Sequence, residues 1–308
     1  MMPAQERVLV LGANGFIGSH LVDSLVSCGF LVRAFGRFEN EPLFNSSESV
    51  EIFKGDFLNQ ADLERALEDV SYVFHLISTT TPATSDKDPT IDLSTNVAGS
   101  IALFQKCIEQ GKVKRIVFAS SGGTVYGDGF EGKPFLETDP TNPISPYGIG
   151  KLAIENYLHY YNRVYGQDYV VLRIANPYGG RQKNTKQQGI MPVLINNITN
   201  NNLITLYGDG SMVRDYIYID DLVNIMVKSL QKSLNHKIYN VSSGIGTSIN
   251  ELVRIVEEVA GKKAIVQYAD SPATFVQTSV LDNARMKQEL QTELTDLHSG
   301  ISSMCPGP

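Results

Sequence analysis

Short apolar runs alternate with amphipathic stretches along the first 173 residues. The apolar runs have the length of buried strands and occupy 7–11, 31–35, 50–54, 72–76, 115–119 and 169–173. Apolar residues at helical spacing fill the intervals 15–28, 60–69, 90–110 and 146–165. Because this alternation is typical of parallel strands joined by covering helices, we expect an α/β fold with a doubly wound parallel sheet.

The pattern changes after Arg173, where polar turns separate shorter elements. It predicts helices at 190–200, 248–260 and 282–290, strands at 203–207 and 264–268, and a return to the sheet within 215–242. We therefore expect two interleaved domains. A dinucleotide-binding domain takes residues 1–173 plus about 214–242, and a smaller C-terminal substrate-binding lobe takes 174–213 plus about 243–308.

Composition narrows the class of protein. The 308 residues, 42% of them hydrophobic, are enough for a large core, and a formal net charge of -7 argues against a nucleic-acid partner. No apolar run has the length needed to cross a bilayer, and the three cysteines show no C-x-x-C spacing. The five histidines are scattered. We expect a cytoplasmic protein without a membrane, nucleic-acid or metal partner.

Three glycines stand where the first strand meets the first helix. Gly12, Gly15 and Gly18 allow a tight turn, the close approach of a pyrophosphate, and packing of the helix against the strand. The helix start at Phe16 and Ile17 offers free N–H groups and a positive dipole to phosphates. This context predicts a Rossmann-type dinucleotide site, whereas a purely structural turn is the alternative.

Tyr147 and Lys151 lie four residues apart in YGIGK, on one face of a predicted helix. A lysine ammonium near a phenol lowers the free energy of ionising it, and the same lysine can hydrogen-bond a ribose. We therefore expect Tyr147 to exchange protons near neutral pH. The alternative is a packed tyrosine and a solvated lysine.

Five segments together carry a family resemblance: LGANGFIG, KGDF, SSGGTVYG, SPYGIGK and LRIANPYG. Over nearly the whole chain they resemble the extended short-chain dehydrogenase/reductase family, in its nucleotide-sugar epimerase/dehydratase branch. The resemblance implies a hydroxyl-Tyr-Lys active centre with Tyr147 as the acid/base and Lys151 as its electrostatic partner.

The hydroxyl of that centre departs from the family pattern. In sugar 4-epimerases it usually lies four positions before the VYG tyrosine, where this chain has Gly122. The role then falls to Thr124, with Ser121 second and Ser120 third. Hydroxyls that satisfy the backbone at the strand end are the alternative.

The resemblance also implies contacts with the cofactor. Asp56, followed by Phe57, matches the carboxylate that bonds the adenine, and Asn96 matches a helix asparagine near the active centre. Ser78 lies just beyond a predicted strand. Both Asp56 and Asn96 could instead be helix caps.

Substrate contacts are implied in the second lobe. Asn176 resembles the asparagine that contacts the nucleotide diphosphate, Arg214 resembles the arginine that clamps it, and Arg181 could contribute. A later family arginine is Ser271 here. The predicted diphosphate site therefore has fewer arginine contacts than the family pattern, or a different arrangement of them.

The end of the second strand indicates the cofactor. Gly36 stands where NAD enzymes place an acidic residue, and Arg37 follows it. Because a guanidinium can pair with the extra phosphate, NADP(H) is favoured over NAD(H), although Glu39 could still reach the ribose. A solvated loop charge is the other interpretation of Arg37.

The family resemblance implies hydride movement at carbon 4 of a nucleotide-linked sugar. The acidic pair typical of 4,6-dehydratases is absent from Gly122–Thr124, which argues against dehydration. We expect NAD(P)H-dependent reduction of a nucleotide-activated 4-keto-6-deoxyhexose, for example dTDP-4-dehydro-6-deoxyglucose, in sugar-nucleotide and polysaccharide biosynthesis. A UDP-hexose 4-epimerase with bound NAD and a non-catalytic NADP sensor are the alternatives.

The resemblance implies a homodimer as well. The helices predicted at 90–110 and 146–165 resemble those that pair across the family's dimer contact. Four residues could form its apolar centre: Leu103, Phe104, Leu152 and Tyr160. Burial within one subunit is the competing account.

Overall fold

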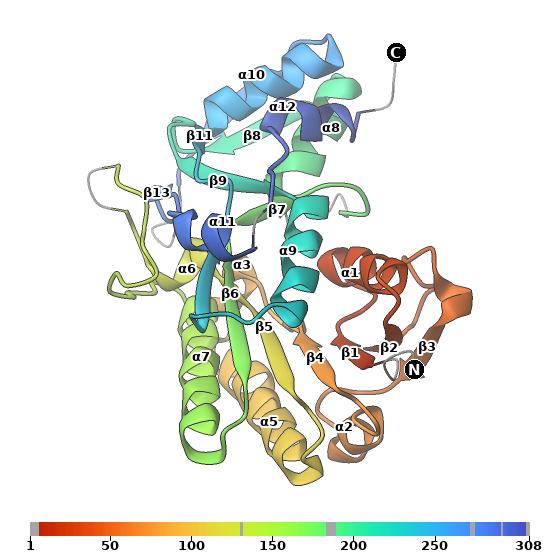
Figure 1. The fold of residues 1–308 in the computed structure, drawn as a ribbon. Helices are drawn as coiled ribbons and strands as arrows, with labels where there is room; N and C mark the ends of the chain where they lie inside the picture. The colour runs from red at the N-terminus through yellow and green to blue at the C-terminus, as the bar shows by residue number, and fades with distance from the viewer. Residues whose placement is uncertain (1–5, 130–131, 183–188, 272–274, 291, 306–308) are drawn as a thin grey trace. The chain divides into compact units, whose positions relative to one another are not determined.

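The computed structural model describes residues 6–129, 132–182, 189–271, 275–290 and 292–305 (Figure 1). The chain divides into two compact units. Unit 1 comprises Met1–Ser120, Pro146–Leu172 and Val223–Tyr239, and unit 2 comprises Ser121–Ser145, Arg173–Leu222 and Asn240–Pro308. The units interleave along the chain, but residues 121–145, 173, 214–222 and 240–242, which we assigned to the dinucleotide-binding domain, fall in unit 2.

A seven-stranded sheet has the order β10-β6-β5-β4-β1-β2-β3. Its strands are β1 (Arg7–Leu11), β2 (Leu31–Gly36), β3 (Val50–Lys54), β4 (Tyr72–His75), β5 (Arg115–Ser121), β6 (Tyr169–Ile174) and β10 (Ile238–Val241). β1 pairs in parallel with β2 on one side and β4 on the other, so the strand order reverses beside β1. This is the place where doubly wound sheets bind ligands, and the predicted fold class is confirmed.

Helices cover this sheet and complete the core of unit 1. They are α1 (Phe16–Ser27), α2 (Gln60–Ala66), α5 (Ala98–Gln110), α7 (Pro146–Tyr165) and α9 (Ile219–Gln231), with shorter turns α3 (Pro82–Ser85) and α4 (Pro89–Ile91). α5 contacts both α2 and α7, and Leu103 and Phe104 of α5 are fully buried in the same core as Ile154 and Leu158 of α7. The prediction that Leu103 and Phe104 form a dimer centre is therefore wrong, because they serve the core of their own subunit.

The helix expected at 90–110 is not regular. After α4 the chain forms a π-helical segment, η2 (Asp92–Val97), before α5 begins. The wider turn buries Asp92 and Asn96, which are only 3% and 5% exposed. Such π-segments occur mostly at functional sites, which draws attention to these two polar side chains.

Unit 2 is built around β9 (Val213–Tyr218). β9 pairs with β7 (Asn176–Tyr178), β11 (Gly246–Ser248) and β13 (Thr278–Ser279), and β8 (Leu203–Tyr207) pairs separately with β12 (Ile265–Ala269). Its helices are α6 (Gly122–Val125), α8 (Ile190–Thr199), α10 (Ile249–Ala260), α11 (Ala284–Leu290) and α12 (Leu297–Ser302). The expected return to the main sheet within 215–242 is thus made by β10 alone, since β9 belongs to this second sheet.

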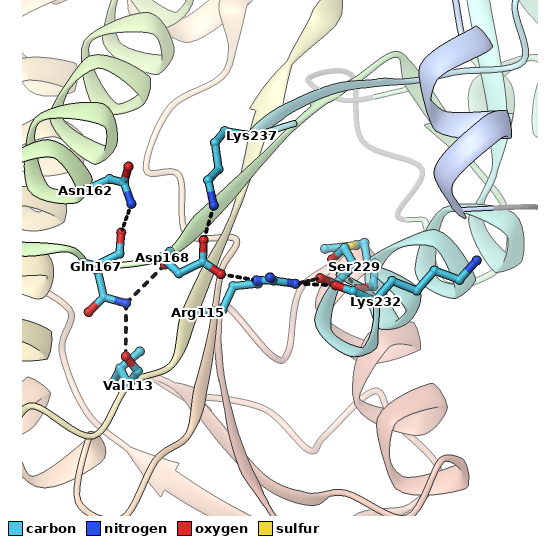
Figure 2. Close-up of polar contacts among 9 residues, drawn as sticks. Val113, Arg115, Asn162, Gln167, Asp168, Ser229, Lys232 and Lys237 are labelled. Atoms are coloured by element: carbon cyan, nitrogen blue, oxygen red, sulfur yellow. Dashed lines mark hydrogen bonds and ion pairs between the residues drawn. The ribbon is translucent and has the colours of Figure 1, made fainter. Parts of the chain in front are cut away.

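A polar network fastens strands and helices of unit 1 to one another (Figure 2). Arg115 donates from Nε to Asp168 Oδ2 at 2.7 Å and from a terminal nitrogen to the carbonyls of Ser229 and Lys232 at 2.7 and 3.0 Å. Those carbonyls lie at the C-terminal end of α9, where a cation is favourable. Lys237 also donates to Asp168. One carboxylate therefore joins segments that are far apart in the sequence.

Replacing Asp168 with Asn is expected to lower the free energy of unfolding at neutral pH by about 1–3 kcal/mol. Partial burial by itself raises the pKa of Asp168, but hydrogen bonds from Lys237 and Arg115 and their charges hold it below its usual value. The stabilisation is therefore present above the unfolded-state pKa of about 3.9 and is lost as the pH falls through the lower folded-state pKa. Urea unfolding of both proteins across this range measures the difference.

Asp69→Asn is the matched control, because Asp69 is paired with Lys112 on the surface, where both side chains are largely exposed. It is expected to change stability little. A difference between wild type and Asp168→Asn that stays the same at acidic and neutral pH would contradict the assignment.

Candidate functional site

The glycine turn between β1 and α1 has the shape that a pyrophosphate requires. Gly12 adopts φ +86, and its amide donates to Phe35 O at 3.1 Å. A Cβ on Gly18 would lie 2.2 Å from Gly12 O, so only glycine lets the helix pack this close to the strand. Sequence reasoning predicted this turn from the same residues.

The start of α1 is open to an anion. Gly15 is its N-cap and has no side chain to cap it, and its first turn, from Phe16 through Gly18, carries no acidic residue. The first amides of a helix have no partner within the helix, and the helix dipole is positive there. The main chain at Phe16 and Ile17 thus fits a dinucleotide pyrophosphate.

The loop after β2 is tied to α1. Asn14 Oδ1 accepts from the amide of Leu43 at 2.7 Å, and Asp23 accepts from the amides of Asn45 and Ser46 at 2.9 Å. Sequence reasoning missed both side chains, although Asn14 lies inside the glycine motif. They hold the segment that follows Gly36 against α1 and the turn before it, where we predict the phosphate site.

Arg37 is available for a ligand. Its side chain is 79% exposed, and its nearest terminal nitrogen lies 4.0 Å from Glu39 Oε1. An exposed pair at this distance is weak, so the guanidinium can move toward a phosphate. The preference for NADP over NAD stays a prediction.

Asp56 and Phe57 follow β3, but their side chains have structural roles. Asp56 Oδ1 accepts from the amide of Leu58 at 3.0 Å, which closes a local turn. The Phe57 ring is 6% exposed and lies 5.2 Å, between ring centres, from the imidazole of His75. The contact of Asp56 with adenine stays a prediction, and the side chain of Phe57 belongs to the core, which leaves only its main chain for a cofactor.

Asn96 fixes the chain beyond β4. Its Oδ1 accepts from the amide and hydroxyl of Thr79 at 2.9 and 3.1 Å, and its Nδ2 donates to Asp92 Oδ1 at 2.8 Å. Ser78 donates to the carbonyl of Thr80 at 3.0 Å. The structure thus places Asn96 against Thr79, the residue next to Ser78, while the contacts of Ser78 and Asn96 with a cofactor stay predictions.

Tyr147 and Lys151 lie on the first turns of α7. Lys151 is 7% exposed, and its ammonium donates to the carbonyl of Ala119 at 2.8 Å. The same nitrogen lies 4.8 Å from the ring centre of Phe118 and 5.6 Å from that of Tyr147. β5 therefore holds the lysine beside the phenol ring, as the spacing predicted.

The proton affinities of this pair differ from the expectation. Burial raises the pKa of Tyr147 to about 12, and the negative charge of Asp92 adds to the rise. Burial lowers the pKa of Lys151 to about 8, while the charges of Asp92 and Glu155 oppose that fall. Tyr147 therefore keeps its proton at neutral pH in this structure. Burial and the charge of Asp92 both favour the protonated phenol, so this pKa moves in the direction opposite to the one expected from Lys151.

Sequence reasoning missed two buried carboxylates beside this pair. Asp92 lies four residues before Asn96, and Glu155, which is 5% exposed, lies four residues after Lys151. Ser120 donates its hydroxyl to Glu155 Oε1 at 2.5 Å, which uses one of the hydroxyls proposed for the substrate. Residues four apart on a helix share one face. The spacing of Asp92 from Asn96 and of Glu155 from Lys151 could therefore have identified both carboxylates.

The other candidate hydroxyls lie in unit 2. Ser121 is the N-cap of α6, and Thr124 in that turn is half-buried and 3.4 Å from the carbonyl of Ser121. A Cβ on Gly122 would lie 2.3 Å from Leu281 Cδ1, so a side chain at that position would require Leu281 to shift. The partnership of Thr124 or Ser121 with Tyr147 stays a prediction.

Asn176 and Arg214 lie on the paired strands β7 and β9. Asn176 donates from Nδ2 to the carbonyl of Asp215 at 2.9 Å, and Arg214 donates to the carbonyls of Val213 and Gln277 at 2.9 and 3.2 Å. Arg181 has a left-handed backbone with φ +62. The strands thus bring Asn176 and Arg214 together, whereas phosphate binding by these residues and Arg181 stays a prediction.

Two searches of the described residues bear on other kinds of site. No group of three or more His, Cys, Asp or Glu side chains in the described ranges could hold a metal ion. Within those ranges, no helix has both the length and the apolar character required to cross a membrane.

Comparison with known proteins gives the same family at several levels. The sequence model of the NAD dependent epimerase/dehydratase family matches residues 8–242. A UDP-glucose 4-epimerase of Mycolicibacterium smegmatis is 34% identical over 291 residues, which cover 92% of each chain. A dTDP-4-dehydro-6-deoxyglucose reductase of Escherichia coli is 32% identical over 293 residues, 93% of this chain and 92% of that protein.

Solved structures share the fold. The UDP-glucose 4-epimerase of Thermotoga maritima, with UDP-glucose, has a TM-score of 0.91 and 34% identity over 96% of each chain. The UDP-glucose 4-epimerase of Thermus thermophilus, in complex with NAD, has a TM-score of 0.90 and 33% identity over 96% of each chain.

Proposed function

We propose a function for this chain, which belongs to the NAD-dependent epimerase/dehydratase family. The predicted resemblance, the Rossmann-type fold and the use of a nicotinamide dinucleotide are confirmed, and the chain is an NAD(P)-dependent nucleotide-sugar epimerase or reductase. Our proposal is the finer activity: reduction of a nucleotide-activated 4-keto-6-deoxyhexose, for which dTDP-4-dehydro-6-deoxyglucose is the model substrate.

The end of β2 is the observation that carries the choice of reduction. Gly36 leaves the ribose position without a carboxylate, and Arg37 beside it is exposed and only weakly paired. A guanidinium there favours the extra phosphate of NADPH, which cells use as an exchangeable reductant. An epimerase that keeps NAD bound gains nothing from this arrangement. The relationship to the E. coli reductase agrees with the proposal.

Different residues of this chain carry out different parts of the reduction. A reduced nicotinamide dinucleotide, held by the first turn of α1, would supply the hydride for carbon 4. Tyr147, whose phenol is protonated at neutral pH, donates its proton to the developing alkoxide oxygen. Lys151, held by the carbonyl of Ala119, provides positive charge beside the phenolate that remains. Asn176 and Arg214 bind the nucleotide diphosphate in this proposal.

Purified protein is expected to oxidise NADPH when dTDP-4-dehydro-6-deoxyglucose is added, at a rate proportional to enzyme concentration. The loss of nicotinamide absorbance measures it, and product analysis by chromatography identifies the 4-hydroxy sugar. Catalysed conversion of UDP-galactose to UDP-glucose without added cofactor, together with no NADPH oxidation, would contradict reduction.

UDP-hexose 4-epimerisation is the second candidate function. It is supported by the 34% identity to the M. smegmatis epimerase and by the likeness to the T. maritima epimerase with UDP-glucose. That reaction first requires removal of a proton from the sugar hydroxyl. Tyr147 would act in that step as the proton acceptor instead of the donor.

The proposed functional form is a homodimer. α7 carries a row of exposed apolar side chains: Ile149, Tyr157, Tyr160, Val164 and Tyr165. Large exposed apolar patches mark interfaces between proteins. Light scattering is expected to give twice the 33.9 kDa chain mass, and Val164→Glu is expected to shift the protein toward monomer. Ile245→Glu, also at an exposed apolar position, is the control, and a monomeric wild type would contradict the dimer.

A further inference from the structure

Asp92 is a carboxylate buried beside the Tyr147–Lys151 pair. It lies on η2, which packs against α7, and is 3% exposed. A Cβ placed on Gly150 would lie 3.5 Å from both the Cβ and the Oδ1 of Asp92. Since Gly150 immediately precedes Lys151 and follows Tyr147 by three residues, Asp92 contacts the helical turn that carries both.

The two oxygens of Asp92 have different surroundings. Oδ1 accepts from Thr80 Oγ1 at 2.6 Å and from Asn96 Nδ2 at 2.8 Å. Oδ2 is equally buried, and no donor in the described part of the chain reaches it. A buried carboxylate with an unsatisfied oxygen is costly unless positive charge lies near. The two hydrogen bonds to Oδ1 fix the orientation of the carboxylate against η2.

We propose that Asp92 is a positioning residue of the reaction, whose buried negative charge keeps Lys151 an ammonium and keeps the proton on Tyr147. The claim about Tyr147 rests on the proposed function, because that function makes the phenol a proton donor. The claim about Lys151 does not depend on the substrate.

The electrostatic balance agrees with this role. Burial lowers the pKa of Lys151, and the charges of Asp92 and Glu155 oppose the change. Burial raises the pKa of Tyr147, and Asp92 raises it further. A single carboxylate therefore stabilises the protonated form of both groups, which is the state that reduction needs when the ketone arrives.

The other ionisable groups near Asp92 can be distinguished from it as sources of this charge effect. His75 on β4 is neutral, because burial lowers its pKa to about 3. Lys106 on α5 pairs with Glu109 and Glu64. The remaining Asp, Lys, Arg and His side chains on the neighbouring elements are exposed, namely Asp86, Lys87, Asp88, His159 and Arg163.

Asp92→Asn tests the charge with little change in shape. The asparagine oxygen can accept from Thr80 and Asn96 as before, and its amide takes the place of Oδ2, which receives no donor from the described residues. In the full-length protein with isotope-labelled lysine, NMR is expected to show Lys151 titrating near 8 in the wild type, the pKa that burial gives it. In Asp92→Asn the midpoint is expected to fall by about one pH unit. Lys151→Met assigns the signal.

Thr80→Val is the matched control, because it removes a hydrogen bond to Asp92 and keeps the charge. Its Lys151 midpoint is expected to stay near the wild-type value. The loss of reductase activity at alkaline pH is expected to move about one unit lower in Asp92→Asn and not in Thr80→Val.

An unchanged Lys151 midpoint in Asp92→Asn would overturn the proposal. The NMR titration needs no substrate, so an error in the proposed reaction would leave it intact and show only in the activity assay. Asp92→Ser, which keeps a small acceptor, is the second variant and is expected to give the same fall. If neither variant folds by circular dichroism, Asp92 is a structural residue and the proposal is wrong.

Discussion

Tyr147→Phe is expected to reduce turnover of the nucleotide sugar by roughly 10²- to 10⁴-fold, which is the usual contribution of general acid catalysis. The substitution removes only the hydroxyl, so the ring that lies 5.6 Å from Lys151 Nζ is retained. Binding of the nicotinamide dinucleotide is expected to change little, since the predicted phosphate site lies on α1. Steady-state kinetics and calorimetric titration with NADPH measure the two properties separately.

Tyr157→Phe is the matched control on the same helix. Tyr157 is 39% exposed, and loss of its hydroxyl is expected to leave turnover within about twofold of the wild type. Full activity of Tyr147→Phe would show that the proton comes from another group. Loss of dinucleotide binding in that variant would indicate a structural effect instead.

Gly18→Ala is expected to weaken binding of the dinucleotide by about 10- to 100-fold, the equivalent of about 1–3 kcal/mol of strain. The added Cβ would lie 2.2 Å from Gly12 O and 2.9 Å from Ala13 Cα. Both are main-chain atoms, so the turn itself must move, and its amides would no longer converge on the pyrophosphate. Calorimetric titration with NADPH and with NADH measures the loss.

Gly180→Ala is the control for this substitution. A Cβ on Gly180 meets nothing within 4 Å, and its backbone lies outside the left-handed region. It is expected to bind dinucleotide like the wild type. Unchanged binding by Gly18→Ala would mean that the cofactor does not use this turn.

The sequence predicts the main sheet well because its strands are short, apolar and separated by helices of regular spacing. The bounds of α7 and β8 agree with the predicted 146–165 and 203–207. β9 was assigned to the wrong sheet. Its apolar residues would suit a strand in either sheet, and nothing local specifies its partners β7, β11 and β13.

The residues of the candidate site could be predicted from the sequence where the backbone geometry permits only one residue type. Gly12 and Gly18 are required by a positive φ and by a close approach, and both restrictions are local. The proton affinity of Tyr147 could not be predicted from its spacing to Lys151. It depends on burial and on Asp92, which reaches α7 through the π-segment η2. We expected one regular helix over 90–110. Apart from the four-residue spacing between Asp92 and Asn96, nothing in the sequence indicated that Asp92 would be buried.

The hydrogen bonds of the Arg115 guanidinium bear on how the protein folds during its synthesis. Its carbonyl partners come 114 and 117 residues later in the chain, and its acid partner comes 53 residues later. While the ribosome is still making the middle of the polypeptide, this cation has no partner. The seven-stranded sheet can take up its edge strand β10 only after Val241 has been made. Because these contacts join residues far apart in the sequence, we expect them to form late in folding.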